Sequence, residues 1–139
     1  MEVKLAVLAD YASITQEGKL NILGIFDEIN TRELPARLPI FYVVVSYRTT
    51  ASEFGKTKVV EVALQDADGN VSVRIQQSVE IPRPARPGMR GTVNQVHGLA
   101  MLPWPRTGQY EFSISVDGHP IGQIPIVVNE PTGGPDGGT

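Results

Sequence analysis

The strand pattern is clearest in residues 109–117, which read QYEFSISVD. The apolar residues of this stretch alternate with polar ones, and they are Tyr110, Phe112, Ile114 and Val116. Because successive side chains of a β-strand point to opposite faces, this alternation predicts a strand with one buried face. Residues 60–65 alternate in the same way, and residues 40–45 form the continuous apolar run expected of a strand covered on both faces.

Turn-forming residues separate further runs of this kind. Glu17-Gly18, Asp68-Gly69-Asn70 and Asp117-Gly118 tolerate positive φ, so each can close a hairpin. No long segment has helical spacing. The predicted strands span about residues 2–15, 19–30, 40–49, 57–66, 71–80, 92–102, 109–117 and 120–128. We therefore predict an all-β fold, an antiparallel β-sandwich of about 7–8 strands, immunoglobulin-like or jelly-roll.

The chain of 139 residues fits one domain, which we expect to cover residues 1–129. A Gly- and Pro-rich tail, residues 130–139, is predicted to be disordered. The absence of Cys excludes disulfides and thiol catalysis, and the net charge of −3 argues against nucleic-acid binding. The sequence shows neither a membrane-spanning run nor a signal peptide, so we expect a cytoplasmic protein.

Two stretches carry a resemblance to a known family. Residues 5–12, LAVLADYA, with residues 18–27, GKLNILGIFD, resemble the opening of a bacterial family of small β-proteins of unknown function. Residues 105–112, PRTGQYEF, with residues 116–118, VDG, are similar to the closing hairpin of that family. The resemblance covers the chain up to the tail and implies a β fold, but it implies no activity and no site residues.

A second resemblance concerns architecture alone. The pattern Gly108-x-Tyr110-x-Phe112 resembles the tyrosine corner of immunoglobulin-like sandwiches, in which a tyrosine hydroxyl bonds to upstream backbone.

The residue types needed for catalysis or metal binding are scarce. A Ser or Thr nucleophile needs a base, and the chain has only His97 and His119. His97 lies within a predicted strand, where a partly buried ring is the ordinary role. Residues 66–70 begin like a calcium loop, but Val71 stands where that loop needs glycine and Gln77 where it needs glutamate. We therefore predict a hairpin turn there, no metal site and no cofactor.

Two carboxylates support a hydrolase hypothesis. If Glu17-Gly18 closes a two-residue loop, Asp10 faces Ile25 and Leu8 faces Asp27. Asp10 and Asp27 would then be diagonal neighbours on one face and could share a proton or hold a cation. The alternative is that each carboxylate is solvated or pairs with a neighbouring base. A register shift of one residue would separate them across the sheet.

Other side chains suggest a sugar- or anion-binding sandwich. Arg83, Arg86 and Arg90 lie in a Pro-rich connection without an acid, which favours either an anion-binding edge or a solvated connector. Trp104 stands between two prolines and could stack on a sugar or cover the core. With His97, Asp10 and Asp27, these residues are the candidate ligand-binding set.

The first hairpin is apolar on both faces. In the two-residue register, Leu8, Leu23 and Ile25 share a face that should otherwise be polar. Burying each side chain would contribute about 1.5–3 kcal/mol, so we expect a partner chain, or the 31–39 or 81–91 loop, to cover them. The favoured hypothesis is a non-catalytic interaction or assembly module that self-associates through Leu8, Leu23 and Ile25.

Overall fold

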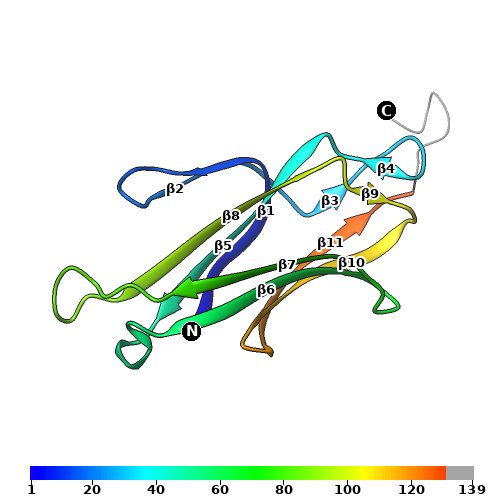
Figure 1. The fold of residues 1–139 in the computed structure, drawn as a ribbon. Coiled ribbons are helices and arrows are strands. Elements are labelled where there is room, and N and C mark those ends of the chain that lie inside the picture. The colour runs from blue at the N-terminus through cyan, green and yellow to red at the C-terminus, as the bar shows by residue number, and fades with distance from the viewer. Residues whose placement is uncertain (131–139) are drawn as a thin grey trace.

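Two β-sheets pack face to face in the computed structural model, which describes residues 1–130 (Figure 1). The first sheet has the order β2 (Leu20–Phe26), β1 (Glu2–Ile14), β5 (Ile40–Thr49) and β8 (Gly91–Ala100). The second has the order β3 (Glu28–Ile29), β11 (His119–Val128), β10 (Gly108–Val116), β6 (Thr57–Asp66) and β7 (Val71–Glu80). A two-stranded ribbon of β4 (Ala36–Arg37) and β9 (Pro103–Trp104) completes the strands, and η1 (Ala51–Glu53) is a single 3-10 turn.

The predicted all-β sandwich is confirmed. Residues 1–130 contain no α-helix, and every long strand occurs close to its predicted position. One prediction was too simple: the second strand ends at Phe26, and β3 then pairs in parallel with β11 at the edge of the second sheet. The predicted tail lies outside the described residues except for Glu130.

The core lies between the sheets and joins residues from both. Its largest fully buried side chains include Trp104, Tyr47, Phe41, Phe112, Leu8, Leu64, Ile114 and Ile126. Trp104 packs edge-on against Tyr110, with ring centroids 5.1 Å apart. The Tyr110 hydroxyl donates to the Arg106 carbonyl at 2.8 Å and accepts from the Arg106 amide at 3.2 Å, which is the predicted tyrosine corner.

A chain of polar side chains runs from the core to the edge of the sandwich, where it links the two sheets. The Tyr47 hydroxyl donates to Gln95 Oε1 at 3.1 Å, and Gln95 Nε2 donates to Gln77 Oε1 at 3.1 Å. Gln95 lies on β8 in the first sheet and Gln77 on β7 in the second, so the chain links the two sheets. Burial raises the pKa of the Tyr47 hydroxyl, which stays protonated and available as a donor.

The β1–β2 hairpin has a register one residue away from the predicted one. Leu8 pairs with Phe26 and Tyr11 with Leu23, because the loop has three residues between Thr15 and Lys19. The Gly18 amide donates to the Thr15 carbonyl at 2.9 Å, and the Thr15 amide donates to the Lys19 carbonyl at 2.8 Å. Gly18 has a φ of +84°, the left-handed conformation that three-residue hairpin loops need at their last position.

The same hairpin folds back over the outer side of its own sheet. Beyond Ala9, β1 no longer pairs with β5 and continues with β2 alone. Yet Asn94 Nδ2 on β8 donates to the Gly18 carbonyl at 3.0 Å. Asn94 is level with Ser46 and Leu5, so the hairpin tip has returned along the sheet instead of extending about 3.3 Å per residue beyond it. Figure 1 shows this bend, with β2 turned back along β8.

The folded-back hairpin explains a second, smaller group of buried residues. Ala9 and Val44 point away from the second sheet and are nevertheless 0% exposed, and Ala12 is also buried. The Tyr11 ring contacts Tyr42 edge-on, with centroids 5.5 Å apart. Part of the hairpin is therefore covered within the chain. The cover comes from contact between the hairpin and the outer face of its own sheet, and not from the 31–39 or 81–91 loop.

Candidate functional site

One face of the folded-back hairpin remains apolar and exposed. We call Tyr11, Leu23 and Ile25 the hairpin patch; their exposed fractions are 49%, 65% and 61%. Tyr11 lies directly opposite Leu23, and Ile25 lies two residues further along β2, so the three side chains share one face. Contiguous exposed apolar residues of this kind mark contact surfaces more often than isolated ones do.

The shift in register changes the predicted interface. Leu8 is 0% exposed and belongs to the core between the sheets, so the prediction that it shares the exposed face was wrong. Leu23 and Ile25 do lie on an exposed face, and Tyr11 joins them. The large, mostly apolar ring of Tyr11 was visible in the sequence as a possible member of this face. The assumed two-residue loop placed it on the opposite side of the hairpin.

The same shift separates the two candidate carboxylates. Asp10 lies on the Leu8 side of β1, whereas Asp27 follows the end of β2 and falls on the other side in this register. The Asp10 carboxylate lies over Gly24, which has a φ of +70° and no side chain in its way. The predicted carboxylate pair is therefore wrong, and the geometry for a hydrolase based on Asp10 and Asp27 is not present.

Trp104 is fully buried and His97 is half-buried. Trp104 is 0% exposed, so the interpretation that it covers the core holds and it has no free face for a sugar ring. Its Nε1 has no hydrogen-bond partner among the described residues. His97 is half-buried opposite Val43, and burial lowers the pKa of its imidazole, which favours the neutral ring.

The predicted calcium-like segment is a turn held by one carboxylate. Asp66 Oδ1 accepts from the Asp68 and Asn70 amides, both at 2.9 Å, as in an Asx turn. The Asn70 amide, with these other donors, holds the pKa of Asp66 below its usual value. Residues 1–130 contain no group of three His, Cys, Asp or Glu residues placed to hold a metal ion.

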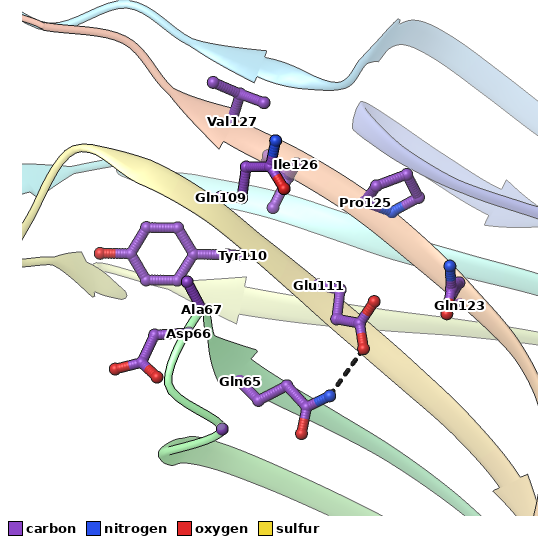
Figure 2. Close-up of a pocket in the computed structure, with 11 residues that line it drawn as sticks. Gln65, Asp66, Ala67, Gln109, Tyr110, Glu111, Gln123, Pro125, Ile126 and Val127 are labelled. Atoms are coloured by element: carbon purple, nitrogen blue, oxygen red, sulfur yellow. Dashed lines mark hydrogen bonds between the residues drawn. The ribbon is translucent and has the colours of Figure 1, made fainter.

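A polar groove lies on the outer face of the second sheet, next to this turn. Its volume is about 490 Å³, and Figure 2 shows residues from β6, β10 and β11 around it. Gln65 Nε2 donates to Glu111 Oε1 at 2.6 Å, so two of its central polar groups already satisfy each other. An outward-facing polar surface is what a solvated sandwich sheet requires. This groove therefore has an ordinary structural explanation.

The arginine-rich connection between β7 and β8 runs past η1. A guanidinium nitrogen of Arg83 lies near Gly55, just after η1. Arg83, Arg86 and Arg90 have no carboxylate within 4.0 Å among residues 1–130. Arg90 lines a groove of about 660 Å³ that Arg48 of β5 also lines. The structure thus brings together one predicted arginine and one that the sequence pattern did not indicate.

A buried ion pair closes the sandwich beside that groove. The α-ammonium of Met1 donates to both oxygens of Glu53, at 2.9 and 2.8 Å, and the Thr50 amide donates to Glu53 Oε1 at 2.9 Å. Burial raises the pKa of Glu53, but these hydrogen bonds outweigh it and hold the pKa below its usual value. Glu53 is therefore a carboxylate with its acceptor sites occupied.

Comparison with known proteins identifies a family but no activity. Residues 4–129 match the sequence model of a family of unknown function (DUF6941). No curated protein matches the chain. No helix in the described part of the chain is long and apolar enough to cross a membrane.

Proposed function

We propose that this chain, which belongs to the family of unknown function DUF6941, is a non-catalytic module that self-associates through its β1–β2 hairpin. The observation that carries the proposal is the hairpin patch of Tyr11, Leu23 and Ile25 beside an edge strand. No described segment of the chain covers this patch, and β2 has β1 as its only strand neighbour in the sheet. The expected cytoplasmic location stays part of this proposal, and cell fractionation would test it.

The free edge of β2 lacks the usual protection against pairing. Natural edge strands carry charged residues or prolines that prevent association with another strand. Residues 20–26, LNILGIF, contain neither. Two copies of β2 can therefore lie side by side without opposing like charges.

Antiparallel pairing of two β2 strands fits the symmetry of a homodimer. An antiparallel pair of identical strands is related by a two-fold axis, which is the commonest symmetry of protein dimers. With the axis near Leu23, the pairing would bring Leu23 and Ile25 of one copy next to those of the other. The backbone edge would then supply hydrogen bonds and the hairpin patch would supply apolar contact.

The oligomeric state tests the proposal directly. We expect a dimer for the wild type in sedimentation equilibrium, and a monomer for Leu23→Lys, because the substitution places two like charges close to the axis. Val71→Lys is the matched control, since Val71 is an exposed apolar residue on the other sheet's edge strand, β7. A monomeric wild type, or equal weakening by both substitutions, would rule out self-association through β2.

Cysteine cross-linking tests the pairing geometry separately. The chain has no Cys, so a single introduced cysteine has only its copy in another chain as a partner. We expect Leu23→Cys to form a disulfide-linked dimer on mild oxidation, because Cα atoms of residues nearest the axis approach to about 5.5 Å. Val71→Cys should form no disulfide-linked dimer under the same conditions. A dimer that cross-links equally at both positions would contradict β2–β2 pairing.

A further inference from the structure

The groove beside the N-terminus is distinct from the hairpin patch and shares no residue with it. It has a volume of about 660 Å³ and lies between the start of β1, the end of β5, η1 and the β7–β8 connection. This volume is within the range of about 300–1,000 Å³ typical of small-molecule sites. The site does not depend on the self-association proposed above.

Two guanidinium groups, Arg48 and Arg90, and one carboxylate, Glu2, line the groove and leave it with an excess of positive charge. Arg90 has no carboxylate partner within 4.0 Å in the described part of the chain. Arg48 has one weak partner, Glu2, at 3.7 Å, and both side chains are substantially exposed. Exposed pairs of this length contribute little free energy, so Arg48 remains available to a stronger acceptor.

The nearest buried acid does not cancel this charge. Glu53 is bonded to Met1 and Thr50, which both line the groove, but its charge is compensated by the Met1 α-ammonium. The chain as a whole has a net charge of −3. Two arginines with one weakly bound acid, Glu2, therefore leave a local excess of positive charge in a chain whose net charge is negative.

The remaining walls of the groove are partly apolar. Met1, Phe54 and Met89 line it, and Met89 is 50% exposed. Thioether and aromatic side chains next to arginines can bind an apolar body that carries an anionic group.

We propose that this groove binds a small organic anion, whose carboxylate or phosphate group contacts Arg48 and Arg90 while its apolar part lies against Met89 and Phe54. Guanidinium groups bind either anion through paired N–H donors. Both chemistries fit the site, and the experiment separates them.

Three naphthalene probes that differ only in their polar group test the proposal by 15N NMR titration of the full chain. These are 2-naphthyl phosphate, 2-naphthoate and the neutral 2-naphthol. We expect saturable shifts of residues 48–51 and 88–90 with at least one anion, and at least tenfold weaker binding of 2-naphthol, equivalent to about 1.4 kcal/mol. Whichever anion binds with the lower Kd shows whether the groove prefers a phosphate or a carboxylate group.

Charge-matched variants locate the site. We expect Arg48→Gln and Arg90→Gln each to weaken binding of the preferred anion about tenfold, because each removes a charge-assisted contact. Arg74→Gln removes the same charge from the outer face of β7 and should leave binding unchanged. Equal binding of 2-naphthol and the anions, equal weakening by all three variants, or no shifts in these segments would overturn the proposal.

An inorganic phosphate titration tests the apolar component. We expect inorganic phosphate to bind at least tenfold more weakly than 2-naphthyl phosphate, because it cannot contact Met89 or Phe54. Equal affinity would overturn the proposal of an organic ligand.

Discussion

The two sheets have edge strands of opposite character. On β7, every side chain that points away from the core is polar except Val71 at the start of the strand; the polar ones are Ser72, Arg74, Gln76, Ser78 and Glu80. On β2, the equivalent outward row is Asn21, Leu23 and Ile25, and the two apolar residues are the most exposed large apolar side chains among the described residues. Arg74 also forms a 2.7 Å ion pair with Glu61, so β7 presents charge to solvent where β2 presents none.

Both strands are exposed at the edge of a sheet, but only β7 carries charged side chains that oppose pairing with another strand. β7 largely follows the rule for a solvated antiparallel sheet, with mostly apolar residues on one face and mostly polar residues on the other. β2 departs from that rule, although Ala9 and Ala12, on opposite faces of β1, are already buried in the folded-back hairpin. The intrachain cover leaves Tyr11, Leu23 and Ile25 exposed, and these are the residues through which we propose self-association.

The largest effect expected from this comparison distinguishes the two faces of the β1–β2 hairpin. Leu8→Ala should lower the free energy of unfolding by about 2–5 kcal/mol, because Leu8 is fully buried between the sheets. Leu23→Ala should change the stability of the monomer by less than about 0.5 kcal/mol. Urea unfolding at low protein concentration measures both. Similar losses would mean that the exposed face of the hairpin is covered within the monomer.

A pair of glycines tests how tightly the hairpin bends. Gly24 and Gly69 have φ of +70° and +85°, so replacement by alanine costs about 1–2 kcal/mol at either position. A Cβ at Gly24 would also overlap the Asp10 carboxylate, whereas nothing lies within 4 Å at Gly69.

Gly24→Ala should therefore exceed Gly69→Ala by about 1 kcal/mol in thermal or urea unfolding, as Asp10 leaves its rotamer. Repeating the Gly24 substitution in an Asp10→Ala background should remove the excess. An excess that persists would show that the backbone, not Asp10, limits the bend.

The smallest expected effect concerns the contact that holds the hairpin tip. Asn94→Ala removes the hydrogen bond to the Gly18 carbonyl, worth about 1 kcal/mol. Amide exchange in β2 should become about fivefold faster while exchange in β7 is unchanged. Ser46→Ala is the control, because it removes the Ser46–Asn94 bond at 2.6 Å but leaves Gly18 paired. Equal acceleration in β2 and β7 would indicate global destabilisation instead.

The sequence predicted most strands because their signals are local. The alternation in residues 109–117 became β10, with Phe112 and Ile114 fully buried, and Gly118 closed its hairpin at a φ of +82°. The register of the first hairpin could not be predicted in the same way. Gly18 suits the last position of a three-residue loop as well as a two-residue loop, and one residue decides which face Leu8 occupies.

The candidate site was less predictable than the fold because it depends on contacts between distant segments. The fold-back of the hairpin needs Gly18 to meet Asn94, which is 76 residues away in the chain. Likewise, Arg90 and Arg48 line the same groove because of the way the β7–β8 connection packs beside η1. Neither contact has a periodic signature in the sequence. Trp104 was ambiguous for a related reason, since its flanking prolines do not indicate which side of the chain faces the core.

The Tyr47–Gln95–Gln77 chain fixes how the two halves of the sandwich are aligned. Apolar side chains attract one another almost regardless of direction, so the core alone would tolerate small sliding of one layer over the other. A hydrogen bond has a preferred length and angle, and sliding would leave the buried Gln95 amide unpaired at a cost of about 1–3 kcal/mol. The apolar residues therefore provide cohesion, and three polar residues select one alignment from those that cohesion alone would permit.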